Sequence, residues 1–177
     1  GLTSINLGGC TSLATIDNTA FGECRSLTSI ILSGCTKLES IRDSAFQNCT
    51  SLETVLLPES LGEIGAQAFY NCSGLTSITL PESLTTIHMW AFYSCSGLKN
   101  IYFYGTVVPT IGTNAFDGVN AEDLAVYYPS SWGSDGNNSL ATLKERLEGG
   151  GLSSLREDQC QSFNPNELST LASFFGL

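Results

Sequence analysis

The chain has 177 residues, of which 42% are hydrophobic and only 14% are charged, so it can bury a core and is not a disordered tail. Its formal net charge is −10, shared between its N-terminal and C-terminal parts. This balance disfavours nucleic acid and anionic membranes as partners, because both are bound through Lys and Arg that neutralise phosphates. No apolar run is long enough to span a bilayer, so no membrane insertion is expected in this segment.

An internal repeat dominates the first two thirds of the chain. Five Ala-Phe pairs recur at intervals of 23 to 25 residues, and their phenylalanines are Phe21, Phe46, Phe69, Phe92 and Phe116. A unit of this length forms one turn of a solenoid, and it buries its apolar side only by stacking against other turns. We therefore expect about five turns and a closing strand over residues 1–129, followed by a C-terminal loop and helical cap over residues 130–177.

The repeat has a recognisable consensus, Cys-x-x-Leu-x-x-Ile-x-Leu-Pro-x-x-Leu-x-x-Ile-x-x-x-Ala-Phe-x-x-Cys. Over residues 1–119 this pattern resembles the BspA-like (Treponema pallidum type) leucine-rich repeat. Two early units carry longer linkers, Val119 stands where Cys would fall, and residues 104–108 replace the Pro-Glu-Ser linker. The resemblance implies an α/β-type, mostly β repeat solenoid, which is a curved right-handed coil with a parallel concave sheet. It also implies surface proteins of bacteria and some protozoa that bind other proteins.

Alternation of side chains along each strand separates a buried ladder from an exposed surface. The central Ile or Val of each strand points inward, so the residue after it points outward. These outward residues predict a partner-binding column, which we call the outward column: Ile31, Leu56, Thr79, Tyr102 and Tyr127. Aromatic anchors on a polar surface favour protein interfaces. The alternative is that they are ordinary exposed strand residues with high β-propensity.

The seven cysteines follow the repeat, and the chemistry of an active site is missing from the pattern. Cys24, Cys49, Cys72 and Cys95 share one repeat position, so reduced and buried structural thiols are expected. There is no Cys-x-x-Cys and no phosphate-binding loop, and the sole histidine, His88, lies at a variable surface position. We therefore predict no catalytic residue, no metal ligand and no cofactor.

The C-terminal segment carries two helix signals. Residues 140–147 have apolar residues at helical spacing, and the glycines at 149–151 end that helix. Asn164-Pro-Asn-Glu167 then starts a second helix whose apolar face runs over residues 168–177. The first interpretation is that both helices cap the last turn. The second is that residues 168–177 dock on a partner or on a second copy.

The N-terminal turn has no cap, so its strand edge predicts either upstream residues or an end-to-end contact between copies. From these patterns we expect a non-enzymatic module that binds a protein ligand through its concave sheet, as in a cell-surface or secreted adhesin or receptor. The alternatives are an intracellular, cytoplasmic scaffold or regulatory domain, and a structural spacer.

Overall fold

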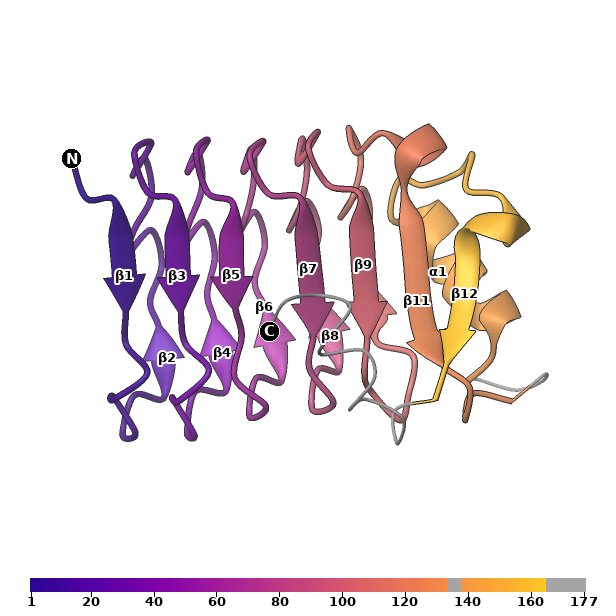
Figure 1. Cartoon of the computed structure of the whole chain (residues 1–177), viewed down its shortest axis with the longest axis horizontal. Coiled ribbons are helices and arrows are strands. Elements are labelled where there is room, and N and C mark those ends of the chain that lie inside the picture. Colours follow the sequence, from indigo (N-terminus) through magenta and orange to yellow (C-terminus); the bar gives the residue numbers. More distant parts are fainter. Residues whose placement is uncertain (134–137, 165–177) are drawn as a thin grey trace.

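A computed structural model describes residues 1–133 and 138–164 as a parallel β-solenoid of about five turns with one C-terminal helix (Figure 1). The fold class expected from the repeat is confirmed. Each turn contributes one longer strand to a row on one side of the coil and one two-residue strand to a sheet on the other side. We call these the front row and the back sheet.

The front row runs along the whole length of the solenoid (Figure 1). It contains β1 (Ser4–Asn6), β3 (Ser29–Ile31), β5 (Thr54–Leu56), β7 (Ser77–Leu80), β9 (Asn100–Phe103), β11 (Ala125–Pro129) and β12 (Cys160–Phe163). Neighbouring turns pair in parallel, with the central residues Ile5, Ile30 and Val55 in register. These side chains are buried, because a β-branched residue at the middle of each strand points into the coil.

The back sheet was not expected as a separate sheet. It contains β2 (Thr15–Ile16), β4 (Ser40–Ile41), β6 (Glu63–Ile64), β8 (Thr86–Ile87) and β10 (Thr110–Ile111). All of its strands pair in parallel without interruption. The core is therefore enclosed between two parallel layers, and each turn pairs with its neighbours on both sides of the coil.

The phenylalanines of the Ala-Phe pairs stack into one continuous column. Phe21, Phe46, Phe69, Phe92 and Phe116 have ring centroids 5.2–5.3 Å apart and planes within 12° of parallel. The backbone holds this spacing, since each phenylalanine N–H donates to the alanine carbonyl of the next turn at 2.7–2.8 Å for the first four. Identical side chains therefore lie directly above one another through the core.

Two residues in each turn have a left-handed backbone, and most of them are not glycine. One precedes the Ala-Phe pair and the other precedes the next cysteine position, as Ser44 and Asn48 do with φ of 57° and 59°. This conformation is uncommon for residues with a Cβ atom. Hydrogen bonds between turns stabilise it here, because the Ser44 and Asn48 N–H groups donate to Ala66 and Tyr70 of the next turn at 2.9 and 2.8 Å.

Helix α1 (Leu140–Gly149) closes the C-terminal end of the coil, as the helical spacing predicts. Its N-terminus is capped by the Ser139 side chain, which accepts a hydrogen bond from the Thr142 N–H. Leu143 and Leu147 are fully buried against the core. At its end, the Gly150 carbonyl accepts the bond from Phe116 N–H at 2.7 Å, in the place that the alanine of a further turn would take.

Gly151 is needed for this close approach of the helix end to the last turn. Its φ is +102°, and an added Cβ would lie 2.7 Å from the backbone nitrogen of Asp117. Only glycine avoids both the steric clash and the strain of that backbone conformation. The glycines that the sequence suggested as a helix terminator therefore also bring α1 into contact with the coil.

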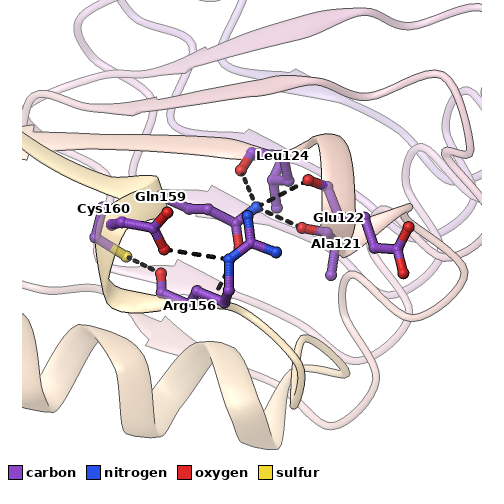
Figure 2. Close-up of polar contacts among 7 residues, drawn as sticks. Ala121, Glu122, Leu124, Arg156, Gln159 and Cys160 are labelled. Carbon is purple, nitrogen blue, oxygen red and sulfur yellow. Dashed lines mark hydrogen bonds and ion pairs between the residues drawn. The ribbon is translucent and has the colours of Figure 1, made fainter.

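Beyond α1, the chain adds a strand that the sequence did not predict. β12 pairs in parallel with β11 and extends the front row past residue 129. It is held by Gln159, a buried polar side chain (Figure 2). The Gln159 Nε2 donates to the carbonyls of Ala121, Glu122 and Leu124 at 2.6, 3.3 and 2.7 Å.

The two ends of the solenoid differ. At the N-terminal end, β1 and β2 each have a strand partner on one side only within the described chain, and Leu2 is 48% exposed. At the C-terminal end, α1 and the segment that carries β12 cover the core. The second predicted helix begins at Asn164 and runs over residues 165–177, and these last residues lie outside the described part of the chain.

Candidate functional site

The outward column forms a register line across the front row. Ile31 pairs with Leu56, Thr79 pairs with Tyr102, and Tyr102 pairs with Tyr127. The strands thus bring together, position by position, the five residues that alternation predicts. Whether the column binds a partner remains a prediction.

The members of the column differ in exposure. Thr79 is exposed, while Ile31, Leu56 and Tyr127 are half-buried. Tyr102 is buried, with 9% of its surface exposed, so its expected exposure was wrong. One reason is the stacking of its ring on Tyr127, with centroids 4.6 Å apart and planes 12° from parallel.

The front row is interrupted between β5 and β7. Strand pairing joins β1, β3 and β5 on one side and β7, β9, β11 and β12 on the other, and none joins β5 to β7 within the described chain. Leu7 and Leu32 each donate a backbone bond to the next turn, at 2.9 and 2.8 Å, whereas the Leu57 N–H makes no equivalent bond to the described residues. We call this interruption the seam, and the two strands stand visibly wider apart there (Figure 1).

The seam coincides with a change in repeat length. Ser4, Ser29 and Thr54 occupy one position at a spacing of 25 residues, whereas Ser77 and Asn100 are 23 residues apart. The linker after β5 is shorter than the linker after β3, and loops of unequal length cannot stack residue on residue. The back sheet continues across the same turns, so the mismatch opens only the front row.

A hollow of about 430 Å³ lies over the seam, and it takes in four of the five column residues. Thr79 is the small member of the column between Leu56 and Tyr102, so the space above it is not filled by its own side chain. The described lining residues come from β5, β7, β9 and β11 and the residues beside them: Glu53, Thr54, Val55, Leu56, Thr76, Ser77, Thr79, Asn100, Tyr102, Tyr104 and Tyr127. The size is that of an ordinary ligand or side-chain pocket.

Several lining residues were missed as members of a site. Glu53 and Thr76 lie just before β5 and β7, and Tyr104 lies just after β9. Tyr104 is half-buried and packs against Phe163 of β12, with ring centroids 5.0 Å apart. The repeat marks these residues only as variable strand ends, so the one available signal was the aromatic side chain at position 104.

The tyrosines of the hollow are in a water-poor environment. Burial raises the pKa of Tyr102 to about 12, and the neighbouring Tyr127 and Tyr104 raise it further. Burial also raises the pKa of Tyr104, with an added contribution from the negative charge of Glu59. Both phenols are therefore neutral hydrogen-bonding groups near neutral pH.

The cysteine column lies in the core, away from the hollow, and its role is structural. All seven cysteines are free. The Cys49, Cys72 and Cys95 thiols donate to the carbonyls of Phe21, Phe46 and Phe69, each in the preceding turn, at 3.2, 3.3 and 3.2 Å. Burial raises the pKa of Cys49 to about 11, that of Cys95 to about 12 and that of Cys72 beyond both.

Thiol alkylation tests this placement. In the native chain, Cys49, Cys72 and Cys95 should react with iodoacetamide on the order of a hundredfold or more slowly than the exposed Cys10, because they react only after local opening. Mass spectrometry of timed samples measures the rates. Equal rates at Cys10 and Cys72 would contradict the buried column, and equal rates in denaturant are the control.

The same thiols make stability depend on pH. Their pKa values are higher in the folded chain than the ordinary value near 9, so the folded chain retains protons that the unfolded chain releases. The stabilisation is therefore complete below pH 9 and decreases as the pH rises through 11 and 12.

The described residues do not assemble a catalytic or metal centre. His88 Nε2 lies 3.1 Å from Glu63 Oε1, and both side chains are about half exposed on the back sheet. No group of three or more His, Cys, Asp or Glu is placed to hold a metal ion in residues 1–133 and 138–164. No helix in that part of the chain is long and apolar enough to cross a bilayer.

Comparison with known proteins agrees with this architecture. The model of the BspA type leucine rich repeat region matches residues 2–140 in six copies. A leucine-rich repeat protein of T. pallidum is 31% identical over 65% of this chain and 52% of its own, with a TM-score of 0.57. One from Bacteroides ovatus is 23% identical over 93% of this chain and 43% of its own, with a TM-score of 0.56, and shows the fold alone.

The chain thus spans about half the length of these two solved structures. No curated protein matches it significantly. The repeat family indicates a protein-interaction module, and leucine-rich repeats of this type are in general non-enzymatic. With six repeats matched over most of its length, the chain belongs to the BspA type leucine rich repeat family.

Proposed function

We propose that this chain is the non-enzymatic protein-binding part of a cell-surface or secreted adhesin or receptor, and that it binds through the outward column of the front row. The observation that carries the proposal is the coincidence of the column with the hollow over the seam. Leu56, Thr79, Tyr102 and Tyr127 all line a concave space whose surroundings are rich in hydroxyl groups. Protein-binding surfaces combine aromatic anchors with such a polar surround.

The site on the front row fits a protein better than a small substrate. The column continues beyond the hollow to Ile31, so the surface extends over five strands. A parallel sheet edge-on to solvent would present backbone groups, but here the strands present side chains in a regular array. Protein partners engage arrays of this kind through a few central anchors, while surrounding contacts exclude water.

The localisation in this proposal rests on the family. Repeats of the BspA type are typically extracellular or surface-associated. Free thiols are compatible with this location because the ladder is buried and carries protonated sulfur. The acidic surface also suits partners that carry the opposite charge.

A column variant tests the proposal. We expect the combined substitutions Ile31→Ser, Leu56→Ser and Tyr127→Ser to weaken capture of a partner by at least about tenfold, because each removes an anchor of the column. The partner is the protein retained by the intact chain and identified by mass spectrometry. Affinity is then measured with the purified partner by surface plasmon resonance.

A matched control removes exposed apolar groups elsewhere. Met89→Ser with Val107→Ser changes side chains that are 45% and 40% exposed and are not part of the described lining. This variant should bind like the intact chain, and thermal unfolding followed by circular dichroism should show that both variants are folded. Unchanged binding by the folded column variant would reject the front row as the binding surface.

A further inference from the structure

We propose that the hollow over the seam receives an arginine side chain presented by the protein that binds the front row. This inference rests on the proposed function and adds the chemistry of the partner to it. It is argued from the charge of the hollow, the aromatic rings that line it, and its supply of hydrogen-bond acceptors.

The charge around the hollow is negative. Glu53 is exposed and belongs to the lining, and the charge of Glu59 acts on Tyr104 at the same place. No Lys, Arg or His is among the described lining residues. The nearest basic residue along the strands is Lys99, which precedes β9 and is exposed. A carboxylate with no basic partner in the lining attracts a cation more than it attracts an anion or a neutral group.

The aromatic composition of the hollow also favours a cation. Tyr102, Tyr104 and Tyr127 all line it. The faces of tyrosine rings attract Lys and Arg cations, and arginine is the more frequent partner because its planar guanidinium also stacks on aromatic rings. Arginine is enriched among the residues that dominate binding energy at protein interfaces.

Hydrogen-bond acceptors in the hollow match the donors of a guanidinium. Arginine carries five N–H donors and no acceptor, so a site for it must offer several oxygens. The lining supplies the Glu53 carboxylate, the Asn100 side-chain oxygen and the hydroxyls of Thr54, Ser77 and Thr79. The seam adds to this set, because strand pairing does not join β5 and β7 there. An ammonium group has only three donors and would use fewer of these acceptors.

The experiment uses two short peptides and the full chain. The probe is Ac-Gly-Ser-Arg-Ser-Gly-NH2, and its neutral counterpart has citrulline in place of arginine. Titration into the 15N-labelled chain should give saturable amide shifts at Ser77 and Thr79, with a dissociation constant on the order of 1 mM. The citrulline peptide should bind about tenfold more weakly, because it lacks the positive charge.

Charge variants separate a specific site from general attraction to an acidic protein. Glu53→Gln should weaken binding of the arginine peptide by about threefold or more, since it removes the carboxylate that lines the hollow. Glu39→Gln makes the same change at an exposed residue beside β4 of the back sheet and should have no effect. Lys99→Gln should leave binding unchanged or strengthen it.

The inference is overturned if the arginine peptide gives no saturable shift up to about 20 mM, or if citrulline binds equally well. It is also overturned if Glu39→Gln weakens binding as much as Glu53→Gln does. Such a failure is distinct from failure of the proposed function, because the column variant reports on partner capture whatever the charge of the partner.

Discussion

Phe69→Ala is expected to lower the free energy of unfolding by about 3–5 kcal/mol. The Phe69 ring is fully buried and stacks between Phe46 and Phe92, with centroids 5.3 and 5.2 Å away. Its removal loses the apolar burial of the ring and leaves a cavity that the neighbouring rings cannot fill, because backbone bonds hold the turns in place. The residue also lies in the middle of the array, where it supports the turn on each side.

Urea unfolding followed by circular dichroism measures this loss. Phe21→Ala is the matched control, since Phe21 is only partly buried and stacks on one neighbour, Phe46. We expect its cost to be less than half that of Phe69→Ala. Equal costs for the two substitutions would show that the ring column does not stabilise the solenoid in the way its geometry indicates.

Gln159→Glu is the second change with a large expected effect, with a loss of about 3 kcal/mol or more at neutral pH. The Gln159 amide donates to three backbone carbonyls, and its Oε1 accepts from the Arg156 N–H at 2.9 Å (Figure 2). A carboxylate keeps the acceptor but supplies no donor. It would therefore set a second oxygen against the carbonyls of Ala121, Glu122 and Leu124 in a buried place.

The loss should depend on pH with a defined sign. The neutral carboxylic acid can donate one hydrogen bond and the carboxylate cannot, so the pKa of the introduced carboxyl group should be higher in the folded than in the unfolded variant. The loss relative to the wild-type chain should then be smallest below the unfolded pKa, which is about 4.3, and should grow as the pH rises towards 7.

Hydrogen exchange locates the effect, because opening should be greatest in β12 and in the adjoining part of β11. Gln161→Glu is the matched control, since it makes the same chemical change at an exposed position of β12. It should leave exchange in β11 nearly unchanged. If Gln159→Glu and Gln161→Glu have the same effect, then Gln159 does not anchor the cap.

The repeat sequence by itself determined the layout of the core and of the outward column. A periodic sequence places equivalent residues on top of one another, so Phe46 must lie above Phe69 once the turns stack. Alternation along a strand then separates inward Ile30 from outward Ile31 without reference to any other part of the chain. Helix α1 was also predictable, because its apolar spacing and its glycines are local signals.

The tertiary structure alone decided the features that break the period. The seam arises where a 25-residue spacing meets a 23-residue spacing, and the sequence does not state which layer absorbs the difference. Left-handed residues such as Asn48 depend on bonds from the adjacent turn rather than on their own type. Gln159 finds its carbonyl partners 35 to 38 residues earlier in the chain. Repetition carries information between equivalent positions, whereas these contacts join non-equivalent ones, so only the folded chain reveals them.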